Sequence, residues 1–283
     1  MMKGKKWIWS LLVLIGLVCP RVAQSKSDEE KPAYEVSFVV VGARSDAYWV
    51  GDGPDMKVFA HDPGAAPPRD IFIATGKKQS GVASGEEKRK RLMLALNVPT
   101  ERVQLRTSKC DLSARLQSGE DISYKKYTSA QLPPVIGEYT VFMARQPKHK
   151  TWKEPQRLIL SDSEARFPKG AVRVVNLADR PVYIQKGKKV LGHLAPRKSV
   201  VIKKALNAKQ PEVISLWYTH KGRKVPAFRR ALNYQDDQRL NIACTYVPKR
   251  SRPLLSQLFL TAKPLPKPEV PKKKSDTLQA SSS

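Results

Sequence analysis

The sequence predicts an all-β protein built from two small β-sandwich domains. Its apolar runs are short and rich in Val, Ile, Tyr and Phe, and Gly, Pro, Asn or Asp residues interrupt them, which is the pattern of strands and turns. In the second half these runs recur at intervals near the ~8–12 residues expected of a sandwich or barrel. No amphipathic segment of ~10–15 residues separates them, which disfavours a parallel α/β sheet.

The first 25 residues have the organisation of a secretory signal peptide. Lysines precede the apolar run Trp7–Val18, which is shorter than the ~20 residues that a membrane-spanning helix needs. Small side chains in Ala23–Ser25 then suit a signal peptidase, so we predict cleavage after Ser25 and removal of 1–25. Retention through a lipid on Cys19 is the less favoured alternative. No later segment is long and apolar enough to span a bilayer. Because of the predicted signal peptide, we expect an exported chain, periplasmic or extracellular.

Residues 26–33 are polar and are predicted to form a disordered lead-in to an N-terminal β domain over 34–150. Short apolar runs between turn residues mark the strands of this domain. The candidates are Tyr34–Val41, Tyr48–Val50, Met56–Ala60, Asp70–Ala74, Arg102–Arg106, Leu112–Leu116 and Glu138–Ala144.

Two segments are compatible with either a helix or a strand. In 84–96, Ser84 followed by Glu87 fits a helix capping box, whereas the alternating leucines favour a strand over 91–96. We prefer the strand there. In 251–262, the leucine spacing fits a final strand and a short helix equally well, and both interpretations stay open.

A C-terminal β-sandwich domain is predicted over 151–250, with the boundary between Gln146 and Glu164, where residues 146–150 and 152–155 weaken the β pattern. Lys186-Gly187-Lys188 is predicted to be a hairpin turn, and the Pro- and Lys-rich segment 263–283 to be a disordered tail. The strand Arg157–Ser161 fits either domain. The other candidates are Ala171–Leu177, Pro181–Gln185, Lys189–Leu194, Ser199–Lys203, Val213–Thr219, Ala227–Tyr234 and Leu240–Val247.

One stretch of this second domain carries a family resemblance. Phe167-Pro168-Lys169-Gly170 leads into Arg173 and Val175-Asn176-Leu177, Pro181-Val182 follows, and Leu194-Ala195-Pro196 comes further on. This order resembles uncharacterised exported bacterial proteins that share an FPxGxxRxVNLxxxPV stretch, and the resemblance covers roughly residues 157–203. It implies immunoglobulin-like β-sandwiches and an envelope location, and it implies no activity or catalytic residue. Independently of it, the Asn176 amide is expected to tie the end of its strand to the following turn.

The charge balance indicates which partners to expect. The chain holds 52 Lys and Arg against 25 Asp and Glu, a formal net charge of +27. Such a surface attracts polyanions through its long-range potential and counterion release. For an exported chain these are envelope polymers, such as lipopolysaccharide or a cell-wall polymer, rather than nucleic acid. Another envelope protein is an alternative partner, and a solvated basic surface without a dedicated ligand explains the charge equally well.

The residues that could carry chemistry form no recognised motif. His61, His149, His193 and His220 lack metal-binding spacing, and there is no nucleophile elbow, phosphate loop or dinucleotide fingerprint. We therefore predict no catalytic residue, cofactor or metal. Trp49, Trp152 and Trp217 are expected to pack in the core or against hairpins, with a surface platform around Trp152 as the alternative.

Two cysteines, Cys110 and Cys244, remain after the predicted cleavage. An even number in an oxidising compartment permits one disulfide, although Cys244 lies in an apolar run that suits a buried thiol equally well. The function that we expect is a non-enzymatic binding or structural role in the cell envelope. The alternatives are polyanion binding through the basic surface, and a hydrolase or carbohydrate-active enzyme whose site is assembled from distant loops.

Overall fold

The structure is a computed structural model, and it contains strands but no helix among the residues that it describes. These are 33–43, 48–50, 57–59, 66–78, 87–119, 121–147, 149, 151–203, 211–232, 237–247, 254–261 and 263. All of them belong to one compact unit, Pro32–Ser283. Over these ranges no helix is present that could cross a membrane. The predicted signal peptide, and all but one residue each of the predicted lead-in and tail, lie outside the described residues.

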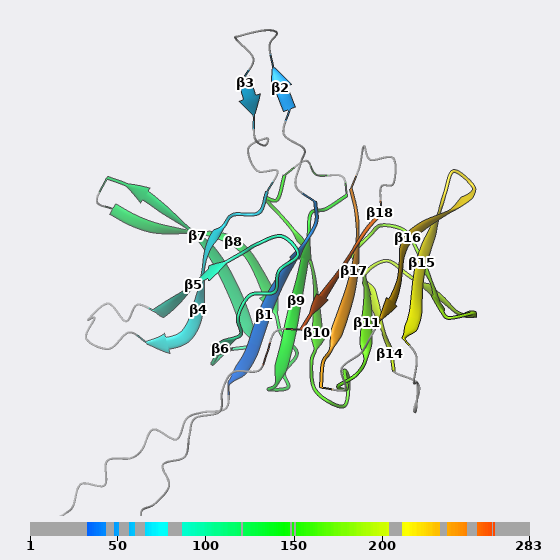
Figure 1. Ribbon diagram of the computed structural model, residues 1–283. Helices are drawn as coiled ribbons and strands as arrows, with labels where there is room; N and C mark the ends of the chain where they lie inside the picture. The colour runs from blue at the N-terminus through cyan, green and yellow to red at the C-terminus, as the bar shows by residue number, and fades with distance from the viewer. Residues whose placement is uncertain are drawn as a thin grey trace, which may run out of the picture. The chain divides into compact units, whose positions relative to one another are not determined.

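The first sandwich is formed by two four-stranded sheets (Figure 1). One sheet has the order β10-β9-β1-β6, with β1 at Tyr34–Val41, β6 at Val103–Leu105, β9 at Glu138–Ala144 and β10 at Gln156–Ser161. The other has the order β5-β4-β7-β8, with β4 at Asp70–Lys78, β5 at Glu87–Met93, β7 at Lys109–Ser118 and β8 at Asp121–Gln131. A separate hairpin pairs β2, Tyr48–Val50, with β3, Lys57–Phe59.

The second sandwich also has two four-stranded sheets. One has the order β14-β11-β17-β18, with β11 at Val172–Asn176, β14 at Lys198–Ile202, β17 at Leu240–Tyr246 and β18 at Leu254–Leu260. The other has the order β13-β12-β15-β16, with β12 at Val182–Lys186, β13 at Lys189–Leu194, β15 at Glu212–His220 and β16 at Arg223–Leu232.

The two sandwiches share one topology. In each, the first strand lies parallel to the last strand but one, as β1 does to β9 and β11 does to β17. The final strand pairs antiparallel with that neighbour, as β10 and β18 do. A middle strand, β6 or β14, completes the sheet on the other side of the first strand. The architecture is therefore duplicated, although the sequence shows no residue-level repeat.

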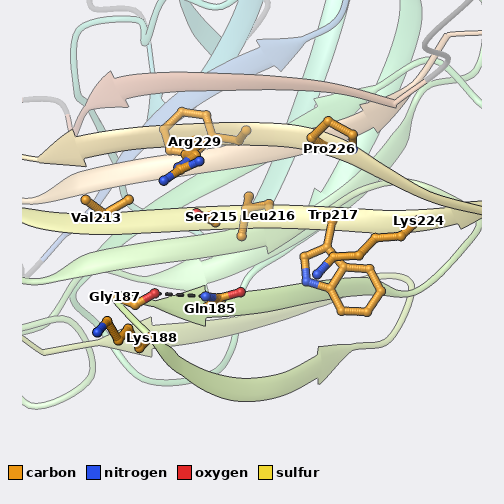
Figure 2. A pocket seen from close by; sticks show the side chains of 11 residues that line it. Gln185, Gly187, Lys188, Val213, Ser215, Leu216, Trp217, Lys224, Pro226 and Arg229 are labelled. Carbon is orange, nitrogen blue, oxygen red and sulfur yellow. Dashed lines mark hydrogen bonds between the residues drawn. The ribbon is translucent and has the colours of Figure 1, made fainter.

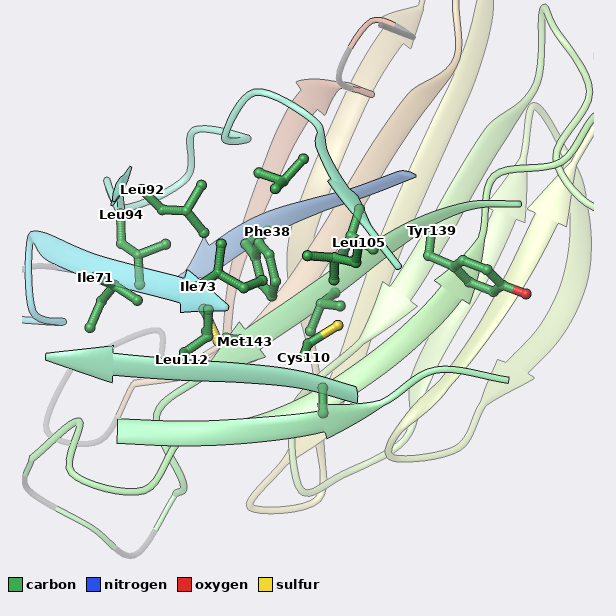
Figure 3. Packing of buried hydrophobic residues seen from close by; sticks show 14 of the residues in the cluster. Phe38, Ile71, Ile73, Leu92, Leu94, Leu105, Cys110, Leu112, Tyr139 and Met143 are labelled. Atoms are coloured by element: carbon green, nitrogen blue, oxygen red, sulfur yellow. The ribbon is translucent and has the colours of Figure 1, made fainter. Parts of the chain in front are cut away.

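Each sandwich encloses its own hydrophobic core. The core of the first includes Phe38, Ile71, Leu112 and Met143, all with at most 1% of their surface exposed (Figure 3). In the second sandwich the core is built in the same way, from the inward side chains of both sheets. Burying large aliphatic and aromatic side chains of this kind stabilises a fold by about 1.5–3 kcal/mol for each side chain.

A third cluster, which we call the joint, connects the two sandwiches. It contains Val39, Val41, Phe142, Ala144, Val175, Leu177, Ala243 and Phe259. Successive side chains of a strand point to opposite faces, so β1 sends Phe38 and Val40 into the first core and Val39 and Val41 into the joint. Both faces are therefore buried, which explains why β1 is apolar almost throughout instead of alternating with polar residues.

Several sequence predictions are corrected by the strand pairing. Strand β10 pairs with β9, so it belongs to the first sandwich, and the boundary between the sandwiches moves from residue 150 to the segment 162–171. The strand preferred over a helix in 84–96 is confirmed as β5, but its bounds are Glu87–Met93 rather than 91–96. Strand β18 pairs with β17, so 251–262 contains a strand and the second sandwich extends past residue 250.

The two cysteines lie in different cores. Cys110 packs in the first core and Cys244 in the second, and both are buried free thiols. The disulfide permitted by the sequence is therefore not formed, because the two cores hold the sulfur atoms apart. Burial raises the pKa of each thiol to about 12, and for Cys244 a hydrogen bond with Ser256 partly opposes the shift.

These buried thiols predict a loss of stability at high pH. Above about pH 9 the unfolded chain ionises its thiols while the folded chain keeps them protonated, so the free energy of unfolding falls until the pH reaches the folded pKa of about 12. Urea denaturation of the wild type and of Cys110→Ala/Cys244→Ala at about pH 8 and about pH 10 measures this contribution. We expect the wild-type advantage to shrink at the higher pH. An equal advantage at both values would contradict the prediction.

Candidate functional site

The candidate site is a groove on the outer face of the sheet β13-β12-β15-β16 in the second sandwich (Figure 2). Side chains alternate along β15, so Ile214, Leu216 and Tyr218 enter the core while Ser215 and Trp217 face outward. Strand β12 alternates in the same way and turns Tyr183 outward. The groove has a volume of about 600 Å³.

A row of aromatic and cationic side chains crosses all four strands at this face. Tyr183 lies opposite His193 of β13 on one side and opposite Trp217 of β15 on the other. The Tyr183 and Trp217 rings are stacked, with centroids 4.0 Å apart and planes 6° from parallel. Lys224 of β16 places its Nζ atom 4.1 Å from the centre of the Trp217 ring, a cation–π contact. The register of the sheet thus assembles a preformed polar and aromatic surface.

A second row runs beside the first and adds charge. Gln185, Ser215 and Arg229 lie directly opposite one another on β12, β15 and β16. Lys188, in the hairpin turn between β12 and β13, and Lys224 are the other cations on the lining. The described lining residues include no Asp or Glu. The groove therefore has an unbalanced positive charge, which favours an anionic ligand.

The indole nitrogen of Trp217 has no hydrogen-bond partner among the described residues. The atom is buried, and no described acceptor lies within hydrogen-bond reach. A buried donor without a partner costs about 1–3 kcal/mol. In Figure 2 the nitrogen lies on the side of the ring that faces Gln185, within the groove. Because the atom is covered, an acceptor oxygen of a ligand reaches this N–H only if a covering side chain moves aside, and Lys224 lies over the same ring.

No protein-family model matches this chain, and no curated protein sequence matches it. The site must therefore be interpreted from its own chemistry.

The residues singled out from the sequence are distributed as follows. His193 joins the groove row, His220 lies near the Tyr218 ring at the far end of β15, and His61 is outside the described residues. Nowhere in the described part of the chain do three or more His, Cys, Asp or Glu side chains gather in a metal-binding arrangement. Trp152 is buried in the first core, as predicted, so the surface platform considered around it is wrong.

A buried charged cluster lies apart from the groove, next to the joint. Asp162, in the segment between β10 and β11, accepts hydrogen bonds from Arg102 at 2.9 Å, from Arg173 at 2.8 Å and from Thr140 at 2.6 Å. Arg102 and Thr140 belong to the first sandwich and Arg173 to the second. The side chains of Asp162 and Arg102 have no exposed surface, and that of Arg173 is 2% exposed.

The surroundings of Arg173 show that this cluster is structural. Its Nε atom donates to Asn241 at 2.8 Å, and its guanidinium lies 4.3 Å from the centre of the Phe167 ring. Burial lowers the pKa of Arg173, and the neighbouring Asp162 opposes the shift. With shared hydrogen bonds and almost no exposed surface, the cluster connects the two sandwiches and is not open to a ligand.

Asn176 has the role that the sequence predicts. Its Nδ2 atom donates to the backbone oxygens of Arg180 at 2.8 Å and Leu194 at 2.9 Å, and its Oδ1 atom accepts from the Ala178 N–H at 3.0 Å. Sequence reasoning missed the groove row, because Trp217 was expected to lie in the core or against a hairpin. The outward alternation of β15 was the one signal that could have revealed it.

Proposed function

We propose that this chain is a non-enzymatic binding protein for an anionic polymer of the cell envelope, and that the groove on β12, β15 and β16 is its binding site. The observation that carries the proposal is the unbalanced positive charge of the groove, whose described lining holds Lys188, Lys224 and Arg229 and no acid. The buried Trp217 N–H, which no described acceptor satisfies, adds a donor under the Lys224 side of this lining. Phosphate and carboxylate groups supply both the negative charge and the acceptor oxygens that this arrangement lacks.

The cellular context belongs to the same proposal. The basic, apolar and small-residue order of residues 1–25 supports export, and outside the cytosol the polyanions are lipopolysaccharide and cell-wall polymers rather than nucleic acid. The duplicated topology, with its first strand parallel to the last but one, supports an immunoglobulin-like classification of both sandwiches.

The test is binding of the purified protein to long-chain polyphosphate and, separately, to lipopolysaccharide over a range of salt concentrations. Lys188→Gln/Lys224→Gln/Arg229→Gln is expected to lower the affinity at least about tenfold and to reduce the slope of log K against log salt by about 2–3, because each lost phosphate contact removes about 0.7–0.9. The two probes distinguish a simple phosphate polymer from a lipid-linked one. The matched control, Lys125→Gln/Lys169→Gln/Lys198→Gln, removes the same charge at exposed positions outside the groove.

A weakening of equal size in both triple variants would show that only the overall charge matters, and the groove would then be rejected as the site. Trp217→Phe provides a further separation, because it removes the N–H and keeps an aromatic ring. The N–H has no partner to lose in the free protein, so we expect the free energy of unfolding to change by no more than about 1 kcal/mol. Binding is expected to weaken about fivefold or more, because the ligand loses this donor. A variant that binds as tightly as the wild type would contradict a role for this donor.

A further inference from the structure

A second groove lies in the gap between β13 and β14 of the second sandwich. These consecutive strands stand at the ends of two different sheets, and no described strand pairs with the outer edge of either. Leu191 lines the groove from β13, Val200–Ile202 line it from β14, and Pro211–Val213 complete it. Its volume is about 690 Å³. The end strand of a sheet presents unpaired backbone N–H and C=O groups, which form a template for another strand.

Large apolar side chains are exposed around this gap. Leu191 has 43% of its surface exposed and Val200 has 37%, and both line the groove. A cluster of this kind on two neighbouring end strands differs from the scattered single apolar residues that are normal on protein surfaces.

A β-bulge directs Leu191 into the gap. Ile184 of β12 lies opposite Gly192, and the next residue, Gln185, lies opposite Val190, so Leu191 has no partner on β12. Gly192 has a φ of +121°, a conformation that glycine adopts without strain. Bulges re-aim side chains and interrupt regular pairing. Strand β13 is therefore a poor template for a further strand, and β14 keeps a regular register with β11 throughout.

The duplicated topology provides an internal comparison. In the first sandwich the equivalent gap lies between β5 and β6, and a groove there is lined by Thr75, Lys88, Arg89, Lys90, Arg91, Arg102, Val103 and Gln104. The same topological position is thus strongly basic in one sandwich and lined by Leu191 and Val200 in the other. The fold does not require apolar residues in this gap, so their presence in the second sandwich calls for a separate explanation.

We propose that β14 binds an extended segment of a partner protein as an added strand, and that this segment carries alternating apolar residues with acidic residues at its ends. Alternation follows from strand geometry, because every second side chain would face Leu191 and Val200. The acidic ends follow from charge complementarity, since Lys189 and Lys203 also line the groove. Glu212, the single acid among the described lining residues, forms an ion pair with Lys186 at 2.9 Å. This site adjoins the proposed polymer groove, since Gly187 and Val213 line both, but Leu191 and Val200 line this one alone.

The probe is a fluorescein-labelled peptide, Asp-Val-Thr-Val-Thr-Val-Thr-Val-Asp, and binding is measured by fluorescence anisotropy with the full chain. Two further peptides have the same sequence and are N-methylated at every second residue, one along each edge of the strand. Methylation retains the charge of the peptide and blocks backbone pairing at the methylated edge. Strand addition predicts that methylation of the edge that faces β14 weakens binding at least about tenfold, whereas binding through charge alone predicts no difference.

Two variants locate the site. Leu191→Ser/Val200→Ser is expected to weaken binding of the unmodified peptide at least about tenfold, because it removes the apolar contacts and leaves the proposed polymer groove intact. Val190→Ser is the matched control: it removes a more exposed apolar side chain of the same strand that is outside the groove lining, and we expect less than about a twofold effect.

Three results would overturn the proposal. The first is equal binding of the unmodified and N-methylated peptides, the second is an equal effect of Val190→Ser and Leu191→Ser/Val200→Ser, and the third is no binding at all. Light scattering is recorded on the same samples. A dimer that dissociates in Leu191→Ser/Val200→Ser would assign the edge to a second copy of this chain and would also reject a partner peptide. Polymer binding is measured in parallel, and its outcome is independent of these results.

Discussion

Asp162→Ala is expected to lower the free energy of unfolding by about 3–5 kcal/mol, which is the typical effect of removing one partner from a buried ion pair. The variant leaves two fully or almost fully buried guanidinium groups, those of Arg102 and Arg173, without the carboxylate that they share. It also removes the acceptor of the Thr140 hydroxyl. Because Arg102 and Arg173 belong to different sandwiches, the substitution destabilises the contact between the two sandwiches.

Equilibrium urea denaturation, followed by tryptophan fluorescence and by circular dichroism, measures this effect. Asp162→Asn keeps the shape and one acceptor oxygen but removes the charge, so we expect a smaller loss than for alanine. Asp179→Ala is the matched control: Asp179 pairs with Arg180 at 3.1 Å on the surface, where such a pair contributes no more than about 1 kcal/mol. If Asp162→Ala and Asp179→Ala had similar effects, the buried cluster would not be what fastens the sandwiches.

Phe142→Ala is expected to cost about 3–5 kcal/mol through the loss of buried surface and the cavity left behind. Phe142 has no exposed surface and points from β9 into the joint. Its ring centroid lies 6.0 Å from that of Phe259 and 5.3 Å from the guanidinium carbon of Arg173, which stacks over it. The substitution therefore opens a cavity in the joint and leaves the side chains of both sandwich cores in place.

The pattern of unfolding tests this location as well as the magnitude. With the joint weakened and the two cores intact, we expect the transitions of the two sandwiches to separate, so that the van't Hoff enthalpy falls below the calorimetric enthalpy. Protease cleavage is expected to begin in the segment 162–171. Phe142→Leu nearly conserves the volume and should cost less than about 1.5 kcal/mol, and Met93→Ala, at a position 69% exposed, should stay within about 0.5 kcal/mol. A single unchanged transition for Phe142→Ala would argue against the joint.

Strand positions were predictable wherever a strand buries at least one face. The predicted bounds of β1, β2, β9 and β13 agree with the structure residue for residue. Strand β8 was not predicted, because its residues up to Lys126 are exposed and mostly polar. Its place is fixed by a hairpin with β7 in which Gly119 has a φ of +60°. Strand β5 consists largely of good helix formers, and its pairing with β4 overrides that local preference.

The candidate site was predictable only in part. The sequence shows lysines around residues 186–189 and arginines at 229 and 230, but it does not show that they surround one face. The stack of Tyr183 on Trp217 depends on the pairing register of β12 with β15, and the aim of Leu191 depends on a bulge. A shift of one residue in either register would move each side chain to the opposite face of its sheet.

The sequence by itself determined the all-β class, most of the strands, the excess of positive charge and the tie from Asn176 to the following turn. The charge follows from composition alone, and the others depend mainly on residues close together in the chain. Only the tertiary structure decided the duplicated topology, the joint, the Asp162 cluster and the two grooves. The physical reason is that each of these depends on which distant strands pair and in which register. That choice is made by the burial of whole sheet faces rather than by any local signal.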